Sequence, residues 1–266
     1  MTPDRLSRRA FSGFLPTILA TCVLTATGIS GCAGLKESRR AEAIGIEWVS
    51  IAGARFVQGD TFLIENPDAL PLHEVTLADF KITRYETTYA QYDAFAKETV
   101  RPQPAAVNGL RGDRAVTGVD WQDAIDFCAW LGARLPSEGE WEYAAAGGVD
   151  KQLWAGTNDE FDVDEYVWHR TNSSFGPEVV GRKLPNRFGL YDMSGNVSEW
   201  IGNYYQYYPE EGEEPAKYDL ETFGIRILRG GDYTMDLEVT RTYWRAGTLK
   251  EIESPAIGFR CARDAN

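Results

Sequence analysis

The segment 232–245 concentrates side chains that can take part in chemistry. Within fourteen positions it carries three carboxylates, two guanidinium groups, two phenols and an indole: Asp232, Asp236, Glu238, Arg241, Arg245, Tyr233, Tyr243 and Trp244. Such a mixture suits recognition of a polar, partly aromatic ligand through hydrogen bonds and ring stacking. Arg241 and Arg245 could instead pair with the neighbouring carboxylates as a purely structural network, and the sequence leaves both interpretations open.

Composition limits the partners and cofactors of the chain. It has 266 residues, is 43% hydrophobic and carries a formal net charge of −13, so it can bury a large core and repels phosphate backbones. We therefore expect no nucleic-acid partner. Two histidines, His73 and His169, cannot supply a three-histidine metal site.

The first residues have the layout of an export signal. Arg8 and Arg9 precede an apolar stretch that ends at Ile29-Ser30-Gly31-Cys32, a combination typical of a twin-arginine signal closed by a lipobox. We expect residues 1–31 to be removed and Cys32 to be lipidated, with residues 32–43 as the lipidated N-terminus and a polar tether. The mature protein would then be a membrane-anchored lipoprotein of a bacterial cell envelope, facing the periplasm or the exterior.

Two cysteines remain in the mature chain after this processing. Cys128 and Cys261 lie 133 positions apart in a compartment that favours disulfides, so one bridge is the expected arrangement. Two unrelated buried thiols are the alternative.

The secondary-structure pattern predicts strands first, then helices, then loops. Short apolar runs in 44–58 and 75–80 indicate strands. Thr87 or Thr88, Asp120 and Ser137 with Glu140 are typical helix caps, so helices are expected after each of them. After Gly148, glycine, proline and aromatic residues favour short strands and packed loops. We expect one domain over 44–266.

Several sequence blocks resemble the formylglycine-generating enzyme, or sulfatase-modifying factor, family. They are Arg134-Leu135-Pro136-Ser137-Glu138-Gly139-Glu140-Trp141-Glu142-Tyr143-Ala144-Ala145, the stretch 185–200 that ends Gly195-Asn196-Val197-Ser198-Glu199-Trp200, Leu228-Arg229-Gly230-Gly231 and Gly258-Phe259-Arg260-Cys261. The resemblance implies a single irregular α+β domain of the C-type-lectin-like type, with little regular secondary structure. It also agrees with a bridge between Cys128 and Cys261.

The resemblance implies calcium as a structural cofactor. It would be bound by the side chains of Asn196 and Glu199 and by backbone oxygen near Val197, which is suitable oxygen chemistry for this cation. Asn172 is a weaker candidate for a second site. A turn fixed by hydrogen bonds of Asn196 and Glu199 is the alternative interpretation.

The chain departs from the family where copper would bind. The two cysteines of the copper site correspond to Met235 and Thr240, and the preceding serine corresponds to Asp232. Paired thiolates are the ligands that hold Cu(I), and a thioether beside a hydroxyl does not replace them. We therefore expect neither copper nor conversion of sulfatase cysteines to formylglycine.

Two functions fit these observations. The first is a binding or accessory lipoprotein whose groove engages an envelope peptide, protein or small molecule, while the lipid anchor contacts the membrane. The groove would be lined by Asp232, Tyr233, Met235, Thr240, Tyr243 and Arg245. The second is an oxidoreductase resembling the pyoverdine-maturation oxidase, with Glu238 or Asp236 as general base and Arg241 or Arg245 stabilising negative charge. Whether the protein is an enzyme stays open at this point.

Overall fold

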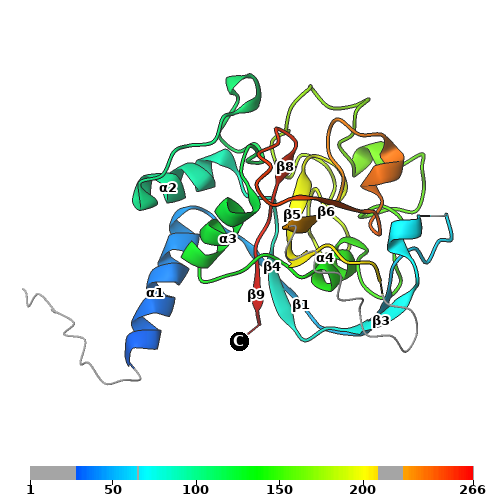
Figure 1. The fold of residues 1–266 in the computed structure, drawn as a ribbon, viewed down its shortest axis with the longest axis horizontal. Helices are drawn as coiled ribbons and strands as arrows, with labels where there is room; N and C mark the ends of the chain where they lie inside the picture. Colours follow the sequence, from blue (N-terminus) through cyan, green and yellow to red (C-terminus); the bar gives the residue numbers. More distant parts are fainter. Residues whose placement is uncertain (1–27, 65, 209–223, 266) are drawn as a thin grey trace, which may run out of the picture.

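The structure, a computed structural model, describes residues 28–64, 66–208 and 224–265, with side chains from residue 34 onward. Figure 1 shows the helices α1 to α3 on one side of the molecule and the strands and long loops on the other. Residues 1–27 of the predicted signal segment 1–31, and the side chain of Cys32, lie outside the described residues. No helix of the described part is long and apolar enough to cross a membrane.

Three small sheets form the β part of the described residues. An antiparallel sheet has the order β1–β4–β9, a hairpin pairs β2 with β3, and a four-stranded sheet has the order β7–β6–β5–β8. β5 and β8 are parallel, and the other pairs are antiparallel. The strands are β1 (Trp48–Ile51), β2 (Arg55–Gln58), β3 (His73–Thr76), β4 (Phe80–Thr83), β5 (Ser198–Tyr204), β6 (Ile225–Arg229), β7 (Arg245–Leu249), β8 (Ile257–Gly258) and β9 (Ala262–Asp264).

Side-chain caps fix the starts of the main helices. Thr88 and Ser137 each form a capping box, at the start of α2 (Tyr89–Thr99) and α4 (Glu138–Ala145), and Asp120 caps α3 (Trp121–Trp130). The predicted helices are therefore confirmed. Short 3₁₀ turns complete the described elements: η1 (Pro67–Ala69), η2 (Val107–Gly109), η3 (Val163–Glu165) and η4 (Leu237–Thr240).

The predicted disulfide lies in an aromatic core. Cys128 and Cys261 are bonded, with their Cα atoms 5.6 Å apart and no exposed surface. Phe127 of α3 packs edge-on against Phe95 of α2 and against Phe259. The bridge therefore joins α3 to the C-terminal segment inside the core, and the prediction of one disulfide is confirmed.

The polar segment 33–43 is not a loose tether, and this prediction is wrong. It belongs to α1 (Gly28–Ala43), which packs on the domain. Ala41 is buried in the main core, Arg40 donates to the carbonyl of Trp130 at 3.0 Å, and Arg40 pairs with Glu98 of α2. The domain therefore begins before residue 44.

The predicted strand over 75–80 divides into two. β3 ends at Thr76, and β4 begins at Phe80 in a different sheet. Between them Leu77 donates its N–H to the carbonyl of Ala54 at 2.9 Å, and Asp79 accepts the N–H of Gly53 at 2.9 Å. These contacts move the chain from one sheet to the other.

Candidate functional site

The segment that follows β6 folds into a tight loop before β7. Gly231 has φ +67°, and a Cβ added there would lie 2.7 Å from the carbonyl oxygen of Val239. Only glycine fits this close approach, so the loop is folded back on itself around η4. We call residues 232–241 the η4 loop.

The two predicted general bases lie on the outside of the η4 loop. Asp236 and Glu238 are both exposed, and Asp236 pairs with Arg170 at 2.5 Å. Met235 is 38% exposed beside them. These three side chains face solvent rather than a closed groove.

Other predicted groove residues hold the loop in shape. Asp232 is buried and accepts hydrogen bonds from the hydroxyl of Ser198 at 3.0 Å and the N–H of Thr234 at 2.9 Å. Tyr233 donates to the carbonyl of Pro255 at 3.2 Å, and Thr240 donates to that of Leu237 at 2.7 Å. Their polar groups are therefore used inside the fold.

Arg241 and Tyr243 lie deeper, among aromatic rings. The guanidinium of Arg241 is 5.9 Å from the ring centre of Trp154 and donates to the Tyr243 hydroxyl at 3.5 Å. Tyr243 is almost fully buried, and this burial raises the pKa of its phenol. Both residues therefore belong to the packed interior next to the η4 loop.

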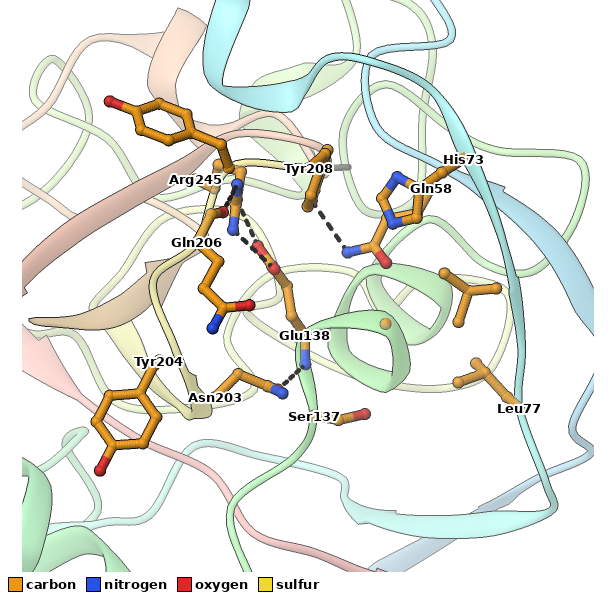
Figure 2. A pocket seen from close by; sticks show the side chains of 13 residues that line it. Gln58, His73, Leu77, Ser137, Glu138, Asn203, Tyr204, Gln206, Tyr208 and Arg245 are labelled. Atoms are coloured by element: carbon orange, nitrogen blue, oxygen red, sulfur yellow. Dashed lines mark hydrogen bonds and ion pairs between the residues drawn. The ribbon is translucent and has the colours of Figure 1, made fainter. Parts of the chain in front are cut away.

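Arg245 belongs to a different place, at the start of β7. Its guanidinium forms a two-point ion pair with Glu138 at 2.7 and 2.9 Å and lies 4.1 Å from the ring centre of Tyr208. Figure 2 shows this pair inside a cavity of about 280 Å³. The predicted groove residues are thus divided between this cavity and the η4 loop.

A second loop extends the surface of the η4 loop. The N–H of Arg170 donates to the carbonyl of Met235, and the hydroxyl of Ser173 donates to that of Tyr233, both at 3.0 Å. Phe175 of the same loop is 84% exposed and has φ +60°. We call the two loops, residues 169–175 and 232–241, the binding face. Sequence reasoning missed Arg170 and Phe175, although an aromatic residue directly before the turn-forming pair Gly176-Pro177 was a usable signal.

The cavity of Figure 2 lies between β3, the start of α4 and the end of β5. Its lining residues are Gln58, His73, Val75, Leu77, Ser137, Glu138, Gly139, Asn203, Tyr204, Gln206, Tyr207, Tyr208 and Arg245. Most of its polar side chains are neutral, since Glu138 and Arg245 neutralise each other. The sequence analysis placed only Arg245 in a site.

The predicted calcium ligands already have protein partners. Glu199 accepts from Arg260 with both oxygens at 2.8 Å and from the indole of Trp141 at 2.8 Å. The side-chain oxygen of Asn196 accepts the N–H of Glu178 at 2.7 Å. No three Asp, Glu, His or Cys side chains in the described ranges lie close enough together to hold a metal ion. Asn196 and Glu199 therefore do not offer free oxygens.

Asp192 offers a better oxygen in the same corner. It is buried, one of its oxygens accepts the N–H of Gly181 at 2.7 Å, and the other has no hydrogen-bond partner in the described structure. Burial raises the pKa of Asp192 to about 6, and the charge of Glu199 adds to this effect. Asn172 is less suitable, since its side chain bonds to Val167, Asp164 and His169. Calcium stays a prediction, and Asp192 fits it better than Asn196.

The two positions that correspond to the copper cysteines of the family, Met235 and Thr240, differ in exposure. Met235 is exposed, whereas Thr240 is buried and bonded to Leu237. The cysteine side chains that the structure describes, Cys128 and Cys261, are joined in the disulfide. The described part of the chain thus contains no thiolate pair at the η4 loop.

The core, the disulfide and the buried motif blocks define an α+β domain of the formylglycine-generating-enzyme type. The chain belongs to the family of the sulfatase-modifying factor enzyme 1-like domain, whose model matches residues 36–265. The match begins inside α1, which agrees with a domain that starts before residue 44.

Curated relatives cover most of the chain. A serine/threonine-protein kinase pkn1 of Chlamydia pneumoniae is 30% identical over an alignment of 255 residues, which covers 87% of this chain and 40% of that protein. The formylglycine-generating enzyme of Thermomonospora curvata is 28% identical and covers 81% of this chain and 93% of its own length. The chain thus spans about 40% of the length of the chlamydial relatives.

Solved structures share the fold at similar levels. PvdO from Pseudomonas aeruginosa matches with a TM-score of 0.69 and 27% identity, over 82% of this chain and 94% of that one. Treponema denticola variable protein 1 matches with a TM-score of 0.69 and 25% identity, over 82% and 95%. The single-domain α+β fold is therefore confirmed.

Proposed function

We propose that this protein is an exported lipoprotein that acts as a binding or accessory factor in the cell envelope. The observation that carries the proposal is the binding face. There, Phe175 and Met235 lie exposed on two loops that hydrogen-bond to each other, and the ion pair between Arg170 and Asp236 crosses from one loop to the other. Exposed apolar side chains rimmed by charges are typical of interaction sites.

The composition of the face favours a peptide or protein segment as its partner. Phe175 and Met235 can contact an apolar side chain, and methionine adapts to different shapes. The charged rim, with Glu238 and Arg170, can orient polar groups of the partner without burying a charge.

A crosslinking experiment with matched variants tests this function. Phe175→Ser with Met235→Ser should abolish zero-length crosslinks between the protein and envelope partners in intact cells. Phe161→Ser is the control, since Phe161 is 98% exposed on a loop outside the face. Equal crosslinking by all three proteins would contradict the assignment of the face.

Lipidation has its own test. Cys32→Ser should move the protein from the membrane fraction to the soluble fraction without changing its fold. Retention of the variant in the membrane fraction would refute the predicted anchor.

The alternative is an oxidoreductase that works without copper thiolates. Its support is the exposure of Glu238 and Asp236, which lets a phenolic or amine substrate reach a carboxylate base, with Arg241 behind the loop. Glu238→Ala should then abolish turnover, whereas a binding factor would keep its partner. Full retention of an identified activity in that variant would remove Glu238 from the mechanism.

Calcium would be a structural cofactor, held by Asp192 and by backbone oxygen near Val197. Its role would be to neutralise the buried carboxylates of this corner, where Glu86 is also fully buried. Elemental analysis of the purified protein should find calcium and no stoichiometric copper or iron. Asp192→Asn should lose the calcium; stoichiometric copper would overturn the interpretation of Met235 and Thr240.

A further inference from the structure

The cavity of Figure 2 is separate from the binding face, since none of residues 232–241 lines it. Its volume of about 280 Å³ lies at the lower end of ligand pockets and suits a single ring with its substituents. The question is which kind of ring its wall can recognise.

Charge argues for a neutral ligand. Both oxygens of Glu138 are taken by Arg245, and the remaining contacts of Arg245 go to the carbonyls of Asp68 at 3.1 Å and Gln206 at 2.8 Å. Both side chains are at least nine-tenths buried. Neither residue therefore offers a free counter-charge, and a charged ligand buried here without a partner would be costly.

The polar side chains of the wall can both donate and accept. Gln58, Asn203 and Gln206 contribute amides, Ser137 a hydroxyl and Tyr208 a phenol. Such groups match a ligand that presents hydroxyls, each of which is also a donor and an acceptor. Figure 2 shows the Gln206 side chain directed toward the space above Ser137 and Asn203.

Apolar surfaces complete the wall. Val75 of β3 and Leu77, which follows this strand, line the cavity, and Figure 2 shows Leu77 on the side opposite Gln206. Tyr207 also lines the cavity and has 58% of its surface exposed. An aromatic ring and aliphatic groups suit the C–H face of a saturated, polyhydroxylated ring.

The wall is already fixed in place. The N–H of Glu138 donates to the side-chain oxygen of Asn203 at 2.8 Å, and the amide of Gln58 donates to the Tyr208 hydroxyl at 3.0 Å. The absence of a side chain at Gly139 leaves room in the cavity, because an added Cβ would lie 3.1 Å from a methyl group of Val75. A ligand would therefore pay little to order the site.

From these features we propose that the cavity binds one neutral sugar ring, a pyranose either free or within an envelope glycan. Its hydroxyls bond to Gln206, Asn203 and Ser137, and one C–H face rests on Tyr207.

Calorimetry and saturation-transfer NMR with methyl glycosides of glucose, galactose, mannose and N-acetylglucosamine test the proposal. At least one glycoside should bind saturably at millimolar concentration, and Gln206→Leu should weaken it about tenfold, the effect of roughly one lost hydrogen-bonding group. The backbone carbonyl that Arg245 uses is unchanged in that variant. Tyr207→Ala should weaken glycoside binding more than Gln206→Leu does. Gln103→Leu, on an exposed loop, is the control and should leave glycoside binding unchanged.

Three results would overturn the proposal. They are no binding of any glycoside, tighter binding of a uronate than of its neutral methyl ester, and displacement of the glycoside by a capped neutral dipeptide of higher affinity. A free sugar that binds as well as its methyl glycoside indicates a free saccharide, and preference for the glycoside indicates a ring within a chain; both support the site. Phe175→Ser with Met235→Ser should leave glycoside binding unchanged. A failure of the sugar-site proposal is therefore distinguishable from a failure of the function proposed for the binding face.

Discussion

Ion pairs of the core and ion pairs of the binding face differ in their surroundings. The side chains of Arg229 with Glu142 and of Arg260 with Glu199 have no exposed surface, whereas Arg170 and Asp236 are 61% and 57% exposed. Buried pairs are destabilising to break, and exposed pairs contribute little. The buried pairs, whose residues lie in the motif blocks, therefore stabilise the fold, whereas the exposed pair of the binding face contributes little to it.

The buried charges form a connected network. Glu142 contacts Arg229 and also Lys151 at 2.8 Å, and Arg229 lies 3.6 Å from Glu138. Burial acts to raise the pKa of Glu142, but Lys151 and Arg229 overcome it and hold this pKa below its ordinary value. Five predictions test how far the core and the face differ.

Removing the disulfide should have the largest effect on stability. The bridge closes a loop with a sequence separation of 133, so Cys128→Ala with Cys261→Ala should lower the free energy of unfolding by about 4–5 kcal/mol. Urea unfolding of the variant and of the oxidised wild type measures the difference. A loss below about 1 kcal/mol would show that the core is stable without its crosslink.

Breaking the buried network should come next. Arg229→Met leaves Glu142 with a lost partner and should cost about 3–5 kcal/mol, by the same unfolding measurement. Adding Glu142→Met should recover part of this loss, because no charge then stays unpaired. Arg170→Met is the exposed control and should cost less than about 1 kcal/mol. Similar losses for Arg229→Met and Arg170→Met would remove the contrast between core and face.

A half-buried pair should lie between these extremes. Arg134 and the N–H of Ser137 outweigh burial and lower the pKa of Glu140, so its stabilising effect exists above about pH 4.5 and is lost as the pH falls. Glu140→Gln keeps an acceptor for the capping box and should cost about 1 kcal/mol at neutral pH. The difference from wild type should shrink steadily as the pH falls below about 4.5. Glu74→Gln, in an exposed pair with Arg55, is the control and should cost less than about 0.5 kcal/mol at neutral pH.

A residue of the face should show a gain in stability. Phe175 is exposed with φ +60°, a conformation that asparagine adopts more easily, so Phe175→Asn should raise stability by up to about 1 kcal/mol while weakening partner binding. Val100→Asn, at an exposed position with φ +56°, should give a similar gain without affecting binding. Loss of stability in Phe175→Asn would mean that the ring packs on the domain.

The smallest effect is expected at Glu238. Glu238→Ala should change stability by less than about 0.5 kcal/mol, since the side chain is exposed. Thermal unfolding of this variant checks that any loss of function is not a loss of fold. A large loss would show that the η4 loop is part of the core.

Local patterns predicted the helices and the disulfide, because caps act within a few residues. Ser137 and Glu140 are three positions apart, and their mutual hydrogen bonds at the start of α4 are a local signal that the sequence shows directly. Contacts distant in sequence were not predictable in this way. Arg245 pairs with Glu138, 107 positions away, rather than with carboxylates of its own segment, and α1 is held by Trp130 and Glu98.

The candidate site was predicted only in part for the same reason. The segment 232–245 was identified as important, but a 3₁₀ turn has neither the strand nor the helix period, so the orientation of Asp236 and Glu238 could not follow from the sequence. The contribution of Arg170 and Phe175 depends on hydrogen bonds between two loops.

The docking of α1 has a consequence for geometry at the membrane. In Figure 1, α1 and η4 lie at opposite ends of the long axis of the molecule. With a lipid on Cys32, only nine helical positions, about 14 Å, separate the acyl chains from the buried Ala41. The connection between the lipid and the domain would then be short and rigid rather than flexible. The face of Phe175 and Met235 would then lie at the end of the domain that is far from the bilayer. Partners that approach from that side could reach it.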